Sequence, residues 1–195
     1  MSTTNIVRVE IEPDAARETS AAESAPVRDR QTVRRDGTKI MRWIDGVKIH
    51  PLATQADARG TLTEVHNEQW GLVDSPIMQV VKITVRPGKV KGWSKHKLNI
   101  DRTTVIVGEL KVVLYDDRPE SPTYKLVNEI FLGPQHPGVL VIPAHVFHAV
   151  QNIGTTDAVA LVMPTRPFDY EAPDKYRLPP NNALIPYRFE DVLGW

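Results

Sequence analysis

A short apolar run that ends at a proline and is followed by two histidines constrains the fold of this chain more than any other feature. Residues 138–152 read GVLVIPAHVFHAVQN, so the run ends at Pro143, and His145 and His148 precede a second apolar segment. Proline cannot donate a hydrogen bond to a neighbouring strand, so it marks the end of the first strand. The pattern predicts two buried strands that meet at one edge of a barrel, with His148 at the barrel mouth.

Further short strands are predicted between turn residues along most of the chain. Turns at Asp45-Gly46 and Gly108-Glu109 are typical of hairpins, and Asp45-Gly46 predicts one strand on each side of it within residues 40–52. Segments rich in valine and isoleucine predict the other strands, at 78–85, 103–107, 110–117, 125–133 and 158–163. Strands at a spacing of roughly 8 to 12 residues, with almost no helix, predict an all-β sandwich or jelly-roll barrel.

The amino-acid composition of the N-terminal residues differs from that of the rest of the chain. Residues 1–37 are rich in polar and small residues without a sustained apolar period, so they cannot bury enough surface to offset the entropy of ordering. We expect a mobile N-terminal arm there and a single domain over residues 38–195, which ends in a proline-rich, irregular C-terminal segment. Two different interpretations of the arm are a short swapped strand in VRVEIEP and a basic docking tail through Arg28, Arg30, Arg34 and Arg35.

Charge and composition argue against several functional classes. Lysine plus arginine and aspartate plus glutamate both number 24, and this balance gives no reason to expect nucleic acid or an anionic membrane as a partner. The chain has no cysteine, so a thiol nucleophile and a cysteine metal site are excluded. No apolar run approaches the roughly 20 residues that span a bilayer, and the N-terminus has no signal-peptide pattern. We therefore expect a cytoplasmic protein.

An ordered set of short motifs resembles the dTDP-4-dehydrorhamnose 3,5-epimerase-like family of the cupin superfamily. The matching pieces are Asp57-x-Arg59-Gly60-x-x-x-Glu64, Gln79, Lys91-Gly92-Trp93, Gly108-Glu109, Asp116-Asp117-Arg118-x-x-Ser121-Pro122-Thr123, Ile142-Pro143 with His148, and Tyr170 with Pro173. The resemblance implies a cupin jelly roll, which is a double-stranded β-helix barrel, and a homodimer. It also implies an epimerase or isomerase that acts on a dTDP-linked 4-keto sugar without a metal cofactor.

The resemblance also implies a set of substrate-binding residues. Arg59 and Glu64 match residues that reach the nucleotide from across the dimer, and Gln79 matches a glutamine that faces the substrate. Lys91 stands where the family has an arginine to the diphosphate, and lysine keeps the charge without the bidentate guanidinium. The complete predicted set is Arg59, Glu64, Gln79, Lys91, Trp93, Arg102, Arg118 and Tyr170.

Epimerisation beside a ketone requires a base that removes the carbon-bound proton and an acid that returns one to the opposite face. The family's base directly follows its Arg-Gly-Leu motif, but this chain has Ser94 at that position and His96 two residues later. Ser94 and His96 would point to the same face of a strand, so we expect His96 to be the base. Asp101 or Asp117 is the expected orienting carboxylate, and His148 completes the predicted catalytic set.

Two differences from the family leave three more functions open. The strand ending ALVMPT lacks the family's acid tyrosine, and the C-terminus lacks the later lysine-aspartate motif that supplies its orienting aspartate. A second cupin interpretation makes His96, Asp101 and His148 the ligands of a divalent transition metal. A third interpretation is a sugar-nucleotide 3,4-ketoisomerase, which KGWSKHK resembles, and a fourth is a catalytically silent sugar-nucleotide-binding cupin.

Overall fold

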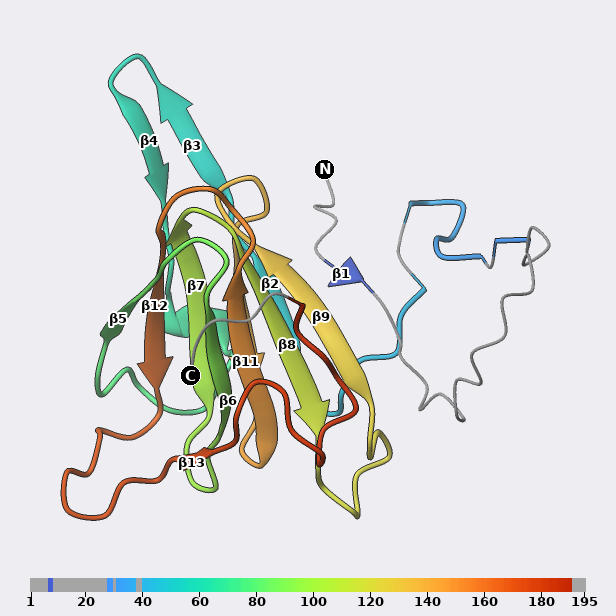
Figure 1. Cartoon of the computed structure of the whole chain (residues 1–195). Helices are drawn as coiled ribbons and strands as arrows, with labels where there is room; N and C mark the ends of the chain where they lie inside the picture. Colours follow the sequence, from blue (N-terminus) through green and yellow to red (C-terminus); the bar gives the residue numbers. More distant parts are fainter. Residues whose placement is uncertain (1–6, 9–27, 30, 38–39, 191–195) are drawn as a thin grey trace.

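The computed structural model describes residues 7–8, 28–29, 31–37 and 40–190, and this part of the chain consists mainly of β-strands and loops (Figure 1). Its one helical element is the short 3-10 turn η1 (Glu68–Trp70). No helix among the described residues is long and apolar enough to cross a membrane. All but two of the described strands form two antiparallel sheets that pack against each other, so the prediction of an all-β jelly roll is confirmed.

The two sheets differ in size. The six-stranded sheet contains, in spatial order, β1 (Val7–Arg8), β9 (Val127–Leu132), β8 (Leu110–Asp116), β11 (Val146–Asn152), β6 (Val90–Lys95) and β13 (Tyr176–Arg177). The five-stranded sheet contains β2 (Lys48–Pro51), β10 (Gly138–Ile142), β7 (Asp101–Val107), β12 (Ala158–Pro164) and β5 (Val81–Val85). The corner at Pro143 therefore carries the chain from one sheet to the other.

The main core fills the space between the sheets. Because side chains alternate along a strand, Val146 and Val150 of β11 share a face with His148, and Val105 of β7 shares a face with Asp101. These three valines belong to the buried cluster, so His148 and Asp101 also lie on inner faces. The cluster comprises Ile44, Val85, Val105, Leu110, Val112, Leu114, Ile130, Leu132, Leu140, Ile142, Val146, Val150, Ala158 and Ala160.

A second buried cluster lies on the outer face of the six-stranded sheet. The C-terminal segment covers this face with Ile185, Tyr187 and Phe189, which pack against Trp93 and its neighbours. As expected, the segment is largely irregular, since β13 is the only strand described after residue 164. The remaining members of this cluster are Val90, Val113, Tyr115, Val127, Phe147 and Ala149.

The predicted N-terminal arm falls mostly outside the described residues. The backbone of Val7 and Arg8 forms β1, which pairs with Ile130 and Glu129 of β9 at the edge of the six-stranded sheet. Further along, the N–H of Ile40 donates to the carbonyl oxygen of Thr32 at 2.9 Å. The mobility of residues 1–37 and the boundary of the single domain stay predictions.

The turn at Asp45-Gly46 is present, but residues 40–44 form no strand before it. The N–H groups of Ile44 and Asp45 donate instead to side chains, namely Asn128 Oδ1 and Thr123 Oγ1, each at 2.9 Å. Side chains therefore accept the hydrogen bonds that a strand partner would have accepted. The prediction of a strand before the turn is wrong.

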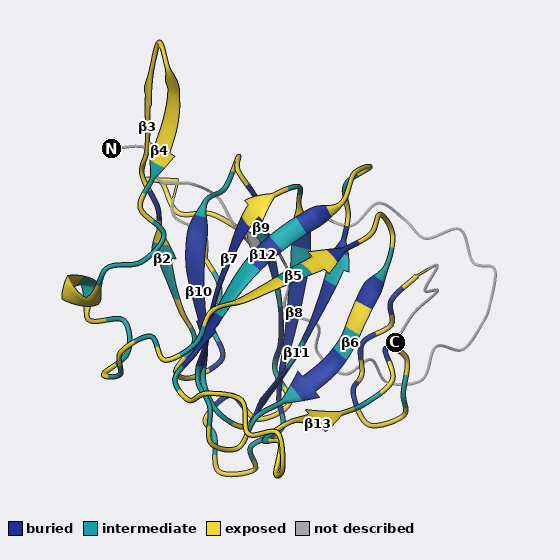
Figure 2. Cartoon of the chain, turned by 90° about the vertical axis from the view of Figure 1, so that its left-hand side faces the viewer, coloured by how far each residue is buried: buried dark blue, intermediate teal, exposed yellow. Residues whose placement is uncertain are grey.

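A separate hairpin projects beyond the two sheets (Figure 1). It consists of β3 (Thr54–Asp57) and β4 (Gly60–Thr63), and almost all of its residues are exposed (Figure 2). Arg59 lies in the turn between the two strands, where 90% of its side chain is exposed. The hairpin therefore presents Arg59 to solvent, away from the main core.

Gly108 is expected to tolerate no side chain, and Gly108→Ala should lower the free energy of unfolding by about 3 kcal/mol. Its φ is +72°, and an added Cβ would lie 2.8 Å from the Cα of Ala158. Gly88 is the matched control, because its φ is +69° but its Cβ would meet no atom within 4 Å. Gly88→Ala should cost only about 1 kcal/mol. Equal losses in urea unfolding of the two variants would contradict the steric argument.

Candidate active site

Two histidines and an aspartate meet between the sheets. His96 directly follows β6, Asp101 begins β7 and His148 lies on β11. Oδ2 of Asp101 lies 3.5 Å from Nε2 of His96 and 3.7 Å from Nε2 of His148. The two imidazole rings stack with their centroids 5.6 Å apart and their planes at 23°. The structure thus brings together three residues that the sequence analysis selected.

Strand pairing and the corner after β10 place these histidines. Ser94 of β6 lies opposite His148 of β11 in the register, so Ser94 and His148 are cross-strand neighbours. The N–H of His145 donates to the carbonyl oxygen of His96 at 2.6 Å. His145 has a φ of +66°, in the left-handed region that favours glycine. The corner next to Pro143 therefore supports His96 directly.

Both ring nitrogens of His96 face oxygen atoms. Nδ1 contacts the backbone carbonyl oxygen of Asp174, and Nε2 faces the carboxylate of Asp101. A carbonyl oxygen can only accept a hydrogen bond, so we assign the proton of the neutral ring to Nδ1. Nε2 then carries the lone pair, and a second proton on Nε2 would face a negative charge.

His148 differs from His96 in its electrostatic surroundings. Burial lowers the pKa of His148 to about 4, because desolvation outweighs the opposing effect of the Asp101 carboxylate. The charge of Lys175, and that of His96 when its ring is protonated, favours the same neutral form of His148. At neutral pH His148 is therefore uncharged, and it does not neutralise the negative charge of Asp101.

The C-terminal segment contributes two residues that the sequence analysis missed. The carboxylate of Asp174 accepts three backbone N–H groups from the turn after His96, at 2.9, 2.8 and 3.1 Å. Burial alone raises the pKa of Asp174, but these hydrogen bonds lower it below its usual value. Burial lowers the pKa of Lys175, and its charge interacts with those of Asp101 and Lys91. Both residues come from a proline-rich stretch without any motif or period that would predict these contacts.

Trp93 cannot contact a substrate, so its assignment to the binding set is wrong. Its side chain is fully buried, and its Nε1 donates to the carbonyl oxygen of Pro180 at 2.9 Å. The indole packs edge to face against Tyr187, with ring centroids 6.1 Å apart. Alternation along β6 places Trp93 on the outer face of the sheet, away from Ser94.

Arg102 is also a structural residue and does not belong to the binding set. Only 1% of it is exposed, and its guanidinium donates to the carbonyl oxygens of Met163, Ser75 and Pro76 at 3.2, 2.9 and 3.1 Å. It lines a cavity of about 330 Å³ beneath residues 66–76. Because neighbouring residues of a strand point to opposite faces, this cavity lies on the other side of β7 from Asp101.

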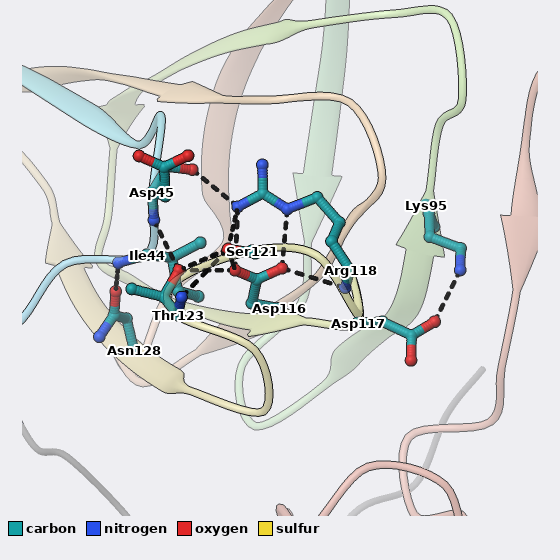
Figure 3. Close-up of polar contacts among 9 residues, drawn as sticks. All are labelled: Ile44, Asp45, Lys95, Asp116, Asp117, Arg118, Ser121, Thr123 and Asn128. Atoms are coloured by element: carbon teal, nitrogen blue, oxygen red, sulfur yellow. Dashed lines mark hydrogen bonds and ion pairs between the residues drawn. The ribbon is translucent and has the colours of Figure 1, made fainter.

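Arg118 and Asp117 are engaged elsewhere, as Figure 3 shows. Nε of Arg118 lies 2.7 Å from the buried carboxylate of Asp116, and its Nη2 donates to the carbonyl oxygen of Asp45 at 2.8 Å. The carboxylate of Asp117 pairs with Lys95 at 2.9 Å. Arg118 therefore holds loops together, and its predicted role toward a substrate stays a proposal. Asp117 is paired with Lys95 and not with a histidine. Asp101 is the carboxylate next to His96.

Three more predicted residues lie on exposed or partly exposed parts of the chain. Lys91 is exposed on β6 and pairs with Val150 of β11. Gln79 accepts a hydrogen bond from the N–H of Phe168 at 3.0 Å. Tyr170 is 83% exposed, and its ring packs edge to face against Phe168 with centroids 5.1 Å apart. Their predicted roles toward a substrate stay proposals.

Arg59 and Glu64 are on or beside the projecting hairpin. Arg59 Nη2 pairs with Asp57 Oδ2 at 2.6 Å within its own turn. Glu64 accepts a hydrogen bond from Asn67 at 2.9 Å. Neither is part of the cluster around His96, and their predicted roles toward a nucleotide stay proposals.

The histidine and aspartate cluster suits two kinds of chemistry. The ligand atoms of His96, Asp101 and His148 lie within 4.8 Å of one another. Two imidazole nitrogens and one carboxylate oxygen are a donor set that divalent transition metals accept. A histidine beside a carboxylate is equally suited to proton transfer without a metal.

Two facing antiparallel sheets with this cluster between them define a cupin-type jelly-roll protein with a candidate acid-base centre. The chain belongs to the family described as Polysaccharide biosynthesis C-terminal domain, which matches residues 55–176, more than half of its length. The match includes all strands from β4 to β12.

Known relatives agree with this assignment. The chain is 34% identical over 138 residues to the probable low-salt glycan biosynthesis epimerase Agl13 of Haloferax volcanii, covering 70% of this chain and 88% of that protein. A dTDP sugar isomerase from Desulfovibrio desulfuricans has a TM-score of 0.69 and 26% identity, over 74% of this chain and 90% of that one. The dTDP-4-dehydrorhamnose 3,5-epimerase of Bacillus anthracis, solved with TDP and PPi bound, has a TM-score of 0.63 and 19% identity, over 71% and 82%. The resemblance to epimerase-like cupins is confirmed.

Proposed function

We propose that this protein is a nucleotide-sugar epimerase or isomerase that removes a proton beside the ketone of a dTDP-linked 4-keto sugar, without a metal cofactor. The observation that carries the proposal is the placement of His96 next to Asp101 between the two sheets. The similarity to a dTDP sugar isomerase and to a glycan biosynthesis epimerase supports this substrate class.

His96 is the base in this proposal. The lone pair on Nε2 takes the carbon-bound proton, and the electron pair of the C–H bond moves onto the ketone oxygen to form an enolate. The imidazolium then has one N–H toward the Asp174 carbonyl oxygen and one toward the Asp101 carboxylate. Both oxygens stabilise the positive charge that the ring acquires, which lowers the barrier to proton removal.

The proposed nucleotide side includes charges from two subunits. Lys91 is exposed on β6, and its charge interacts with that of Lys175, so these two positive charges together suit a diphosphate. We place Gln79 and Tyr170 on the sugar side. Because Arg59 lies on the projecting hairpin, with Glu64 beside it, the two are proposed to reach the nucleotide of a second copy in a homodimer. A cytoplasmic location is part of the same proposal.

The experiment that tests this function uses the native protein and a dTDP-linked 4-keto sugar in D₂O. Solvent deuterium is expected to enter the sugar at the carbon beside the ketone, and dTDP should raise the melting temperature of the protein. The exchange rate should be the same before and after treatment with a chelator, with metal content checked by elemental analysis.

Two different outcomes would replace the proposal. If exchange stops on chelation and returns when a divalent transition metal is added, His96, Asp101 and His148 would be metal ligands. Stabilisation by dTDP without any deuterium incorporation would identify a silent sugar-nucleotide-binding cupin.

A further inference from the structure

The C-terminal segment reaches His96 from 78 positions further along the chain. It joins the six-stranded sheet through β13, in which Tyr176 pairs with Lys95, and the N–H of Leu178 donates to the carbonyl oxygen of Trp93 at 3.0 Å. These contacts hold the segment against β6, the strand that leads into His96.

Asp174 is bound to the turn after His96 through both its side chain and its backbone. Its carboxylate accepts the N–H groups of Lys97, Leu98 and Asn99, and its own carbonyl oxygen contacts Nδ1 of His96. Hydrogen bonds to an ionised carboxylate are stronger than those between neutral groups. The carboxylate therefore fixes the position of the carbonyl oxygen relative to the imidazole ring.

This carbonyl oxygen decides which nitrogen of His96 can act as a base. A neutral imidazole has one proton, and two oxygens compete for it: the Asp174 carbonyl at Nδ1 and the Asp101 carboxylate at Nε2. Without the carbonyl, the charged carboxylate is the stronger acceptor, and the proton would reside on Nε2. The lone pair would then be on Nδ1, on the far side of the ring from Asp101 and His148.

We propose that Asp174 is the positioning residue of His96. By fixing the turn at residues 97–99, its carboxylate holds the carbonyl that keeps the proton on Nδ1 and the lone pair on Nε2. The C-terminal segment is therefore part of the active site and not only a cover for the outer face of the sheet. The catalytic consequence rests on the proposed function, whereas the tautomer of His96 does not.

Asp169 provides a matched control on the same segment. Its carboxylate accepts the N–H groups of Glu171 and Ala172, each at 2.9 Å, so it makes the same kind of bonds as Asp174. These bonds lie within its own loop and not on the turn after His96. If alanine merely loosens the segment, Asp169→Ala and Asp174→Ala should have similar effects. A change in the ring of His96 should appear only in Asp174→Ala.

The direct test is ¹⁵N NMR of the histidine rings in the free protein, with His96 assigned from the spectrum of His96→Gln. At a pH at which the His96 ring is neutral, native protein should show its proton on Nδ1. In Asp174→Ala the signal should move toward the Nε2–H form, whereas Asp169→Ala should match the native protein. Asp174→Asn keeps one acceptor oxygen for the turn and should largely restore the Nδ1–H form.

The activity arm compares kcat and KM of the same variants in the deuterium assay. Asp174→Ala should lower kcat by about a hundredfold with little change in KM, because a misplaced base affects the chemical step. Unchanged ring signals in Asp174→Ala, or equal changes in Asp169→Ala, would overturn the inference whatever the activity. If the native protein shows no exchange at all, the proposed function fails, and the ring signals alone decide the tautomer.

Discussion

Replacing His96 with alanine is expected to slow deuterium incorporation beside the ketone by about a hundredfold or more, because general-base catalysis contributes factors of this size. Alanine removes Nε2, the atom that faces Asp101 and receives the proton in the proposed mechanism. The binding of dTDP should change little, since the charges proposed for the diphosphate are on other residues. The measurement is the initial exchange rate by NMR, together with the melting-temperature shift caused by dTDP.

Ser94→Ala is the control for this prediction. Ser94 is buried on β6, opposite His148 in the register, so it is close to the cluster without being a proton acceptor at neutral pH. The deuterium exchange rate of Ser94→Ala should stay within about threefold of the native rate. This corresponds to a change in the activation free energy below about 1 kcal/mol. Greater sensitivity at Ser94 than at His96, or exchange that persists in both variants, would place the base elsewhere.

Asp116→Ala should have the largest effect on stability, a loss of about 3 kcal/mol or more in the free energy of unfolding. The carboxylate of Asp116 is fully buried and receives hydrogen bonds from Arg118, from Ser121 Oγ at 2.6 Å and from Thr123 Oγ1 at 2.6 Å (Figure 3). Removing it would leave a partly buried guanidinium and two hydroxyl groups without their acceptor. Urea unfolding followed by circular dichroism measures the loss.

The pH dependence of stability gives a second readout for Asp116. Burial alone raises the pKa of Asp116, but the hydrogen bonds from Arg118, Ser121 and Thr123 outweigh it and lower the pKa below its usual range. A lowered pKa in the folded state means that the stabilisation is fully present above the unfolded value of about 3.9 and is lost as the pH falls through the folded value. The native protein should therefore lose more stability below about pH 4 than Asp116→Ala does.

Asp117→Ala is the matched control, one position further along the chain. Asp117 pairs with Lys95 near the surface, and about a quarter of its side chain is exposed (26%). This single ion pair at a partly exposed site should contribute less than the buried network, so Asp117→Ala should cost less stability than Asp116→Ala. Equal losses in the two variants would contradict the structural role assigned to the network around Asp116.

The sequence by itself determined the fold class and most of the strands. Alternating and β-branched residues, the end of a strand at Pro143 and the turn at Gly108 are local signals that depend on a few neighbouring residues. The motif order was sufficient to indicate the epimerase-like cupin family. It also selected His96, Asp101 and His148, because these residues lie at or next to the positions of the two cupin motifs.

The hairpin at Asp45-Gly46 marks the limit of such local signals. The turn dipeptide was sufficient to predict the turn itself, but the strand before it is absent. Asn128 and Thr123 bind the N–H groups of Ile44 and Asp45 from about 80 positions away in the chain, with separations of 84 and 78. No pattern within residues 40–52 contains that information.

Only the tertiary structure decided which polar and aromatic residues are free to bind a ligand. Arg102 and Arg118 look like substrate ligands in the sequence, yet distant carbonyl oxygens and the neighbouring Asp116 occupy their guanidinium groups. Trp93 is covered by the C-terminal segment, whose Pro180 accepts its N–H. Asp174 holds His96 through a backbone carbonyl, a group that every residue has, so no residue type can signal it. Its role follows from the packing of β13 against β6 and from the bonds of its carboxylate to the turn after His96, which together bring the carbonyl to the imidazole ring.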